Sequence, residues 1–300
     1  LSREAIGLPL VGGAKRGGNT PFSFFGLLLA LFAATASAQG DAKRGEYVSK
    51  AAGCLGCHTE EGRNAQPYAG GRELKTPFGT FFGPNITPHA QAGIGRWSEQ
   101  DFSNAMRRGL RPDGAHYYPA FPYPSFARIT DQDLRDLWAY MRSLPQSERP
   151  SRAHELRFPF KWRWLVWFWK LLFFSPGPFA PDPAQSATVN RGAYLTNVLA
   201  HSGECHTPPN FLGGPRNSRH LAGAKVGEAT ATNLTPARLK KVSDDYLREV
   251  LQTGMTPDGD VLSESMSEVA RNTTSQLTRQ DLDAVIAYLR SLPPLPDEPK

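Results

Sequence analysis

Two stretches of the chain carry the same amphipathic pattern. Apolar residues recur three and four positions apart over residues 134–144 and again over 282–292, a spacing that lines them along one face of a helix. Thr130 and Thr278 precede these stretches as N-cap candidates, each with an aspartate three residues later, and a proline follows each stretch. The pattern predicts two equivalent helices, each with one buried face.

The similarity between the two parts of the chain extends well beyond these helices. Short motifs recur at an offset of 147 or 148 residues, which is the signature of an internal repeat. They are Arg44-Gly45-Glu46-Tyr47-Val48 with Arg191-Gly192-Ala193-Tyr194-Leu195, Cys57-His58-Thr59 with Cys205-His206-Thr207, and Asn85-Ile86-Thr87-Pro88 with Asn233-Leu234-Thr235-Pro236. We therefore expect one domain duplicated, with a helix before each Cys-His motif and a last helix packed across it.

Length and composition agree with such a duplication. Three hundred residues suit two domains of roughly 100 to 130 residues each. The 26 prolines and 28 glycines indicate long ordered loops between modest helices. We expect an all-α fold with domains at 39–148 and 186–300, joined by a Trp- and Pro-rich segment at 149–185.

The first 38 residues resemble a secretory signal rather than a part of the fold. Lys15 and Arg16 precede an apolar run over residues 22–32, and Ala36-Ser37-Ala38 offers the small residues that signal peptidase requires. The run is short for a membrane span. We expect cleavage before Gln39 and a periplasmic mature protein.

The segment Cys54-Leu55-Gly56-Cys57-His58 carries the clearest chemistry. Covalent attachment of haem c needs two thiols separated by two residues, with a histidine directly after them to bind the iron. A redox dithiol or half of a zinc site would be the alternatives, but no βαβ pattern is visible and only one further cysteine remains. We interpret Cys54 and Cys57 as haem attachment residues and His58 as an iron ligand.

The second copy of this motif is incomplete. It reads His201-Ser202-Gly203-Glu204-Cys205-His206, so that a second haem would be attached through Cys205 alone, with His206 as a ligand. Met266 follows 60 residues later in a polar stretch and is interpreted as the distal ligand, the alternative being an ordinary core or surface methionine. Loss of the second haem is the other interpretation of the motif.

Five runs of residues carry a resemblance to a known family: Asn233-Leu234-Thr235-Pro236, 266–277 (MSEVARNTTSQL), 287–293 (AYLRSLP), 93–98 (GIGRWS) and 118–124 (YPAFPYP). They resemble the same runs in periplasmic multihaem cytochromes c that accept electrons from bacterial dehydrogenases. The best-known relatives are cytochrome subunits of membrane-bound alcohol, aldehyde and gluconate dehydrogenases. The resemblance implies two class I cytochrome c domains, each with a histidine and a distal methionine at its iron.

One position departs from that family pattern and concerns the first haem. Phe121 stands where the family has methionine, and its side chain offers no lone pair to iron. The first haem would then have an open or water-bound iron, or a substitute ligand. His116, five residues upstream, is one possible substitute, and Met106, inside an expected helix, is a less plausible one.

A stretch rich in tryptophan lies between the two expected domains. Residues 158–174 hold Trp162, Trp164, Trp167 and Trp169 together with Lys161, Arg163 and Lys170. About 14 apolar residues are too few to span a bilayer. We expect the stretch to pack between the domains, or alternatively to make peripheral contact with a membrane or a partner through residues 161–174.

These observations favour an electron-transfer protein. Without residues 1–38 the formal charge falls from +6 to +4, which is too small to imply binding to nucleic acid. We expect a dihaem cytochrome that accepts electrons from a dehydrogenase and passes them to the respiratory chain. The alternatives are a haem enzyme or a gas- or peroxide-binding protein with an open iron above His58, and a structural subunit that anchors a dehydrogenase through residues 161–174.

Overall fold

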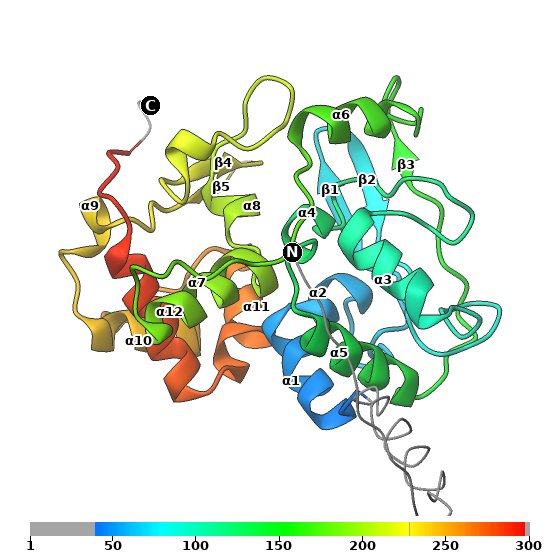
Figure 1. Cartoon of the computed structure of the whole chain (residues 1–300), viewed down its shortest axis with the longest axis horizontal. Helices are drawn as coiled ribbons and strands as arrows, with labels where there is room; N and C mark the ends of the chain where they lie inside the picture. Colours follow the sequence, from blue (N-terminus) through cyan, green and yellow to red (C-terminus); the bar gives the residue numbers. More distant parts are fainter. Residues whose placement is uncertain (1–39, 228, 298–300) are drawn as a thin grey trace, which may run out of the picture. The chain divides into compact units, whose positions relative to one another are not determined.

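The computed structural model describes residues 40–227 and 229–297, and the expected signal peptide at 1–38 lies outside them. The described residues belong to one compact unit. We refer to α1 through α5 as the N-terminal half and to α7 through α12 as the C-terminal half (Figure 1).

The N-terminal half and the connecting segment contain six helices and three short strands among the described residues. They are α1 (Ala42–Ala51), α2 (Cys54–His58), β1 (Glu73–Thr76), β2 (Gly79–Phe82), α3 (Glu99–Arg108), α4 (Tyr123–Phe126), α5 (Asp131–Ser143), β3 (Glu155–Leu156) and α6 (Leu165–Phe173).

The C-terminal half repeats this order with local changes. Its elements are α7 (Ala187–Tyr194), η1 (Leu195–Leu199), α8 (Gly203–His206), η2 (Asn217–Arg219), β4 (Ala224–Val226), β5 (Ala229–Ala231), α9 (Pro236–Leu239), α10 (Asp244–Thr253), α11 (Glu264–Asn272), η3 (Thr274–Gln276) and α12 (Arg279–Ser291).

The two equivalent helices predicted from the hydrophobic pattern are confirmed as α5 and α12. Thr130 is the N-cap of α5, and its hydroxyl accepts a hydrogen bond from the backbone N–H of Asp133 at 3.1 Å. Thr278 caps α12 in the same way, from Asp281 at 3.2 Å. Each cap satisfies one backbone donor that the first turn of a helix leaves free.

Each last helix crosses the first helix of its own half at very short range, as Figure 1 shows for α1 with α5 and α7 with α12. A Cβ atom added to Gly45 of α1 would lie 1.9 Å from the carbonyl oxygen of Asp136, and one added to Gly192 of α7 would lie 1.9 Å from that of Ala284. Only glycine permits backbones to approach this closely. The expected packing of first on last helix is therefore confirmed in both halves.

The fold is mostly helical, but the expectation of an all-α protein was too simple. Strands β1, β2 and β3 form an antiparallel sheet in that order, and β4 pairs with β5. The β1–β2 turn is tight, with Thr76 opposite Gly79, and Gly79 adopts a φ of +124° beside the backbone of Glu155. Segments of two to four residues thus satisfy their backbone groups by pairing with each other.

One apolar cluster runs through both halves. It includes Leu134, Leu137 and Met141 from α5 together with Leu282 and Leu289 from α12, all at most 5% exposed. Within residues 40–227 and 229–297, no helix is long and apolar enough to cross a membrane.

Candidate haem-binding sites

The first haem motif forms a helix of its own directly after α1. Gly53 precedes α2 with a φ of +62°, a left-handed conformation that turns the chain between the two helices. Cys54 and Cys57 lie three residues apart on α2 and therefore on the same face of it. Both thiols are free, and burial raises the pKa of each to about 11. The thiols of Cys54 and Cys57 are therefore placed so that both can bond to one haem group.

The imidazole of His58 is oriented by the backbone. Its Nδ1 lies 2.8 Å from the carbonyl oxygen of Pro84, and since a carbonyl can only accept, Nδ1 carries the hydrogen. Burial lowers the pKa of His58, which favours the neutral ring. The lone pair is then on Nε2, which is the state that an iron ligand requires. The residues of this motif fit a haem iron on this observation.

His206 repeats the arrangement in the C-terminal half. Its Nδ1 lies 2.7 Å from the carbonyl oxygen of Thr232, and this acceptor follows its histidine by 26 residues, just as Pro84 follows His58. Burial lowers the pKa of His206 as well, and only 7% of the residue is exposed. The second histidine is thus fixed in the same tautomer as the first.

The chain after each histidine is also held in an equivalent way. The Thr59 hydroxyl accepts a hydrogen bond from the backbone N–H of Tyr68, and the Thr207 hydroxyl accepts one from that of Leu221. Close to the first motif, a Cβ on Gly83 would lie 1.7 Å from the carbonyl oxygen of Cys57. In both halves, the loop after the motif is therefore hydrogen-bonded to the threonine that follows the histidine.

The second motif differs from the first at its start. Ser202 precedes the short helix α8, and Cys205 carries the one thiol of this motif. His201 adopts a φ of +40°, where the first motif has Gly53, and its ring lies edge-on to Phe126 of the N-terminal half at 5.6 Å. The carboxylate of Glu204 accepts a hydrogen bond from the Ser125 hydroxyl at 3.1 Å. The second motif is thus in direct contact with α4.

Phe121 is packed among aromatic rings. It is partly buried, with ring centroids 5.4 Å from Tyr117, 6.4 Å from Tyr123 and 5.9 Å from Phe126. The position at which the family has methionine is therefore filled by a side chain without a donor atom for iron.

Both residues considered as substitute ligands are engaged in other contacts. The Nδ1 of His116 lies 3.1 Å from the ammonium group of Lys170, which donates to it, so that Nε2 carries the ring hydrogen. Burial, with a smaller effect of the Lys170 charge, lowers the pKa of His116 and keeps the ring neutral. Met106 is 5% exposed and lies on the buried face of α3.

Met266 lies in the first turn of α11 and is partly buried. It shares a helix face with Ala270, four residues later, which is fully buried and lies against Gly254 at the end of α10. The methionine side of α11 is therefore turned toward the C-terminal half itself.

Sequence reasoning missed the contacts that join each motif to the other half. Arg72 forms an ion pair with Glu268 of α11 at 2.7 Å, and α11 packs against α2. Glu268 lies within the run 266–277 and Arg72 precedes β1, but charge patterns 196 residues apart give no signal of pairing in a single sequence.

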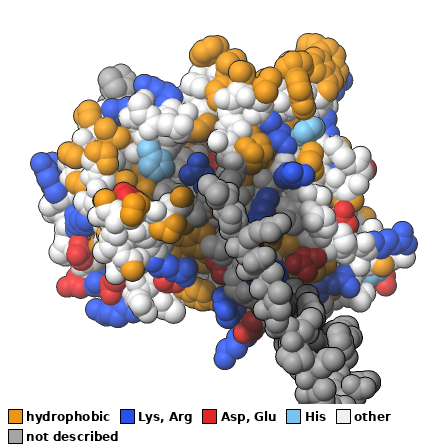
Figure 2. Space-filling view, in the orientation of Figure 1, with side chains coloured by type: hydrophobic (Ala, Val, Ile, Leu, Met, Phe, Trp, Pro, Cys, Tyr) orange, Lys and Arg blue, Asp and Glu red, His pale blue; other side chains and the backbone are white. Residues whose placement is uncertain are grey.

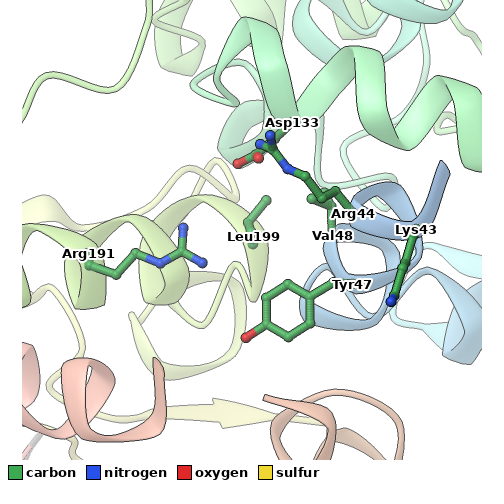
Figure 3. A pocket seen from close by; sticks show the side chains of 7 residues that line it. All are labelled: Lys43, Arg44, Tyr47, Val48, Asp133, Arg191 and Leu199. Carbon is green, nitrogen blue, oxygen red and sulfur yellow. The ribbon is translucent and has the colours of Figure 1, made fainter. Parts of the chain in front are cut away.

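A pocket of about 360 Å³ lies where the first helices of the two halves meet. Figure 3 shows Arg191 and Leu199 entering it from one side and Tyr47 and Val48 from the other. Lys43, Arg44 and Asp133 complete the lining, which contains no residue of either haem motif. The pocket belongs to the contact between the halves and is separate from the haem motifs.

The tryptophan-rich segment packs on the protein through its cations. The guanidinium group of Arg163 donates to the carbonyl oxygen of His116 at 2.7 Å and lies 4.6 Å from the ring centre of Tyr118. Lys170 donates to the carbonyl oxygen of Arg108 as well as to the His116 ring. Two of the three cations of the segment, Arg163 and Lys170, are therefore engaged by the protein itself.

The same segment leaves a group of apolar side chains in solvent, which we call the aromatic face. Figure 2 shows hydrophobic side chains gathered over α6 and the loop before it. The members expose between 44 and 70% of their surface: Trp162, Trp164, Trp167, Phe168, Leu171 and Leu172.

Comparison with known proteins agrees with this geometry. Residues 42–145 match the cytochrome c family. The chain is 42% identical to a dihaem cytochrome c-type protein of Cereibacter sphaeroides over 85% of this chain and 86% of the relative. It is 40% identical to the fructose dehydrogenase cytochrome subunit of Gluconobacter japonicus, with 83% of this chain and 52% of the relative covered.

A third relative is the cytochrome c subunit of the quinone alcohol dehydrogenase of Gluconobacter oxydans, 36% identical over 91% of this chain and 59% of the relative. The chain thus spans between half and two thirds of the length of these two dehydrogenase subunits. Its similarity to the Cereibacter protein covers most of both chains. The chain belongs to the dihaem c-type cytochromes, a family of electron carriers, and binds haem c through Cys54 and Cys57.

Proposed function

We propose that the protein is a periplasmic dihaem cytochrome that accepts electrons from a dehydrogenase and passes them to the respiratory chain. The observation that carries the proposal is the matched pair of oriented histidines, His58 on Pro84 and His206 on Thr232. When bound, the two haem groups supply the one-electron ferric–ferrous couple. The chain supplies their attachment, the orientation of the imidazoles and exclusion of water.

In the second site, Cys205 would hold the haem through a single thioether, and His206 and Met266 would bind its iron. The burial of His206 and the inward face of Met266 on α11 support this assignment. Thioether sulfur raises the reduction potential and occupies the sixth position on the iron. Such a site transfers electrons without binding small molecules.

In the first site, Cys54 and Cys57 would hold the haem and His58 would bind its iron. Phe121 gives no donor atom and His116 is engaged by Lys170, so we propose that this iron lacks a protein ligand on its distal side. This observation favours a second candidate function, binding of a small molecule such as carbon monoxide or peroxide at the first haem.

The visible spectrum of the reduced, periplasmically matured protein, recorded with and without carbon monoxide, separates the two functions. A shift in about half of the haem shows an open first iron, and no shift shows two six-coordinate irons and excludes the second candidate. Phe121→Met supplies a thioether at the open site and should abolish the shift. A shift that persists in this variant would contradict the assignment of Phe121 to the distal side.

We propose that the partner is a dehydrogenase subunit that covers the aromatic face. The side chains of this face are apolar, and two nearby cations, Arg163 and Lys170, are turned toward the protein. Exposed clusters of tryptophan and leucine are typical of the centres of protein interfaces. The names of two relatives, which are dehydrogenase cytochrome subunits, support a partner of this class.

A further inference from the structure

Helix α11 has two faces with different neighbours. Met266 and Ala270 lie four residues apart on one face, and Ala270 is fully buried against Gly254 of the C-terminal half. Glu268 and Asn272 lie four residues apart on another face. Their side-chain ends are the nearest atoms to Gly56 of α2, at 3.4 and 3.6 Å from the place where its Cβ would be. One helix thus contacts the interior of its own half and the haem motif of the other.

The ion pair between Glu268 and Arg72 joins the face of α11 that carries Glu268 and Asn272 to the N-terminal half. The carboxylate and guanidinium groups are 2.7 Å apart, and the side chains are only 26% and 19% exposed. Arg72 is held on its other side by Glu61. A pair that is largely shielded from water and anchored at one end constrains its partner more than a surface pair does.

The first turn of α11 depends on such tertiary contacts. Its N-cap, Ser263, makes no side-chain hydrogen bond to the helix, unlike Thr130 and Thr278 in the last helices. An uncapped first turn frays easily. Met266 sits in this turn, two residues before Glu268.

We propose that Arg72 and Glu268 are positioning residues, which hold the first turn of α11 in place so that Met266 stays on the second haem. The inference rests on the proposed role of Met266 as a ligand. If so, the ligands of the second haem depend on an ion pair that lies beside the attachment segment of the first haem.

The same two charges act on the first haem site. The Glu268 carboxylate lies 3.4 Å from the place where a Cβ on Gly56 of α2 would be, and Arg72 pairs with this carboxylate at 2.7 Å, so both charges are close to the attachment segment. A negative charge near a haem favours its ferric state, whereas a positive charge favours the ferrous state. Glu268→Gln should therefore raise the potential of the first haem, and Arg72→Gln should lower it.

The expected changes in reduction potential differ in sign between the two haems, and this difference provides the test. Spectroelectrochemical titration of the full matured chain should show shifts of opposite sign at the first haem in Arg72→Gln and Glu268→Gln. At the second haem, both variants should lower the potential and weaken the absorption band of methionine-ligated ferric haem. Arg72→Lys, which keeps the charge, should retain most of the band. Opposite shifts at the second haem as well would show a purely electrostatic effect and overturn the proposal.

Two further variants keep the outcomes distinguishable. Met266→Leu should abolish the methionine band; if the band survives there, the assignment of Met266 as ligand fails. If Met266→Leu abolishes the band but Arg72→Gln and Glu268→Gln both retain it in full, the positioning role fails while the ligand assignment stands. Arg248→Gln is the matched control, since Arg248 is 15% exposed and pairs with Asp283 at 2.7 Å within the C-terminal half.

Discussion

The hydroxyl of Tyr47 in α1 donates a hydrogen bond to Oδ2 of Asp281 in α12, 2.5 Å away and 234 residues later in the chain. The reciprocal bond also exists: the Tyr194 hydroxyl of α7 donates to Asp133 of α5 at 2.6 Å. Each tyrosine belongs to the first helix of one half and each aspartate to the last helix of the other. The duplicated sequence therefore forms the same contact twice, which is the reciprocity of an isologous interface.

Removal of these hydroxyls should weaken the association of the halves. Tyr47→Phe and Tyr194→Phe each lose a hydrogen bond to a carboxylate, and we expect each to reduce the free energy of unfolding by about 1 to 3 kcal/mol. Urea unfolding of the matured protein measures the loss. Tyr246→Phe is the control, because that hydroxyl has no hydrogen-bond partner in the described part of the chain. Equal stability of all three variants would show that the reciprocal bonds contribute nothing.

Asp281 should make stability depend on acidic pH. Burial alone would raise the pKa of its carboxyl, but hydrogen bonds from Arg191 and Tyr47 outweigh burial and hold the pKa below its ordinary value. The stabilisation is therefore present above about pH 4, the pKa of an unfolded aspartate, and is lost as the pH falls through the lower folded value. Urea midpoints at pH 7 and about pH 3 should differ less in Asp281→Asn than in the wild type or in the exposed-site control Asp258→Asn.

Because the first and last helices cross closely, adding one methyl group at either crossing should destabilise the protein strongly. Gly45→Ala and Gly192→Ala would each place a Cβ 1.9 Å from a backbone carbonyl oxygen, so the helices must separate. We expect a loss of about 2 kcal/mol or more in the free energy of unfolding. Gly203→Ala is the matched control, because the nearest atom to its Cβ would be 3.6 Å away, which is ordinary contact. A similar loss in all three variants would contradict this explanation.

The single thiol of the second motif predicts two changes in haem attachment. Cys205→Ser should leave one covalently bound haem per chain, as measured by mass spectrometry after denaturation. Ser202→Cys places a thiol three residues before Cys205, at the spacing of Cys54 and Cys57, and should give a second haem with two thioether bonds. The alkaline pyridine spectrum distinguishes one thioether from two. If Cys205→Ser retains two covalent haems, Cys205 is not the attachment residue.

The aromatic face predicts a selective loss of partner binding. The triple variant Trp164→Ser, Trp167→Ser and Leu171→Ser should no longer co-purify with the dehydrogenase subunit, while its haem spectrum stays unchanged. Val261→Ser, an apolar residue outside the segment that is 69% exposed, is the control. Retained co-purification together with lost binding to anionic vesicles would instead assign the face to lipid.

Local sequence patterns were sufficient for a large part of the fold. The threonine caps and apolar spacing gave α5 and α12, and Cys54, Cys57 and His58 gave the first haem site. These signals work because a cap or an attachment motif is complete within about five residues. The hairpins β1–β2 and β4–β5 were missed, since strands of three or four residues carry too little periodicity.

By itself, the sequence determined that several motifs repeat at an offset of 147 or 148 residues, that the first copy attaches haem c, and that Phe121 and Ser202 depart from the pattern of the other copy or of the family. Only the tertiary structure decided that Tyr47 bonds to Asp281, that Arg72 pairs with Glu268, and that Arg163 and Lys170 face the protein. The physical reason is that these contacts join groups far apart in the chain. Which charge or hydroxyl finds which partner depends on how the helices pack, and one sequence contains no local signal of that choice.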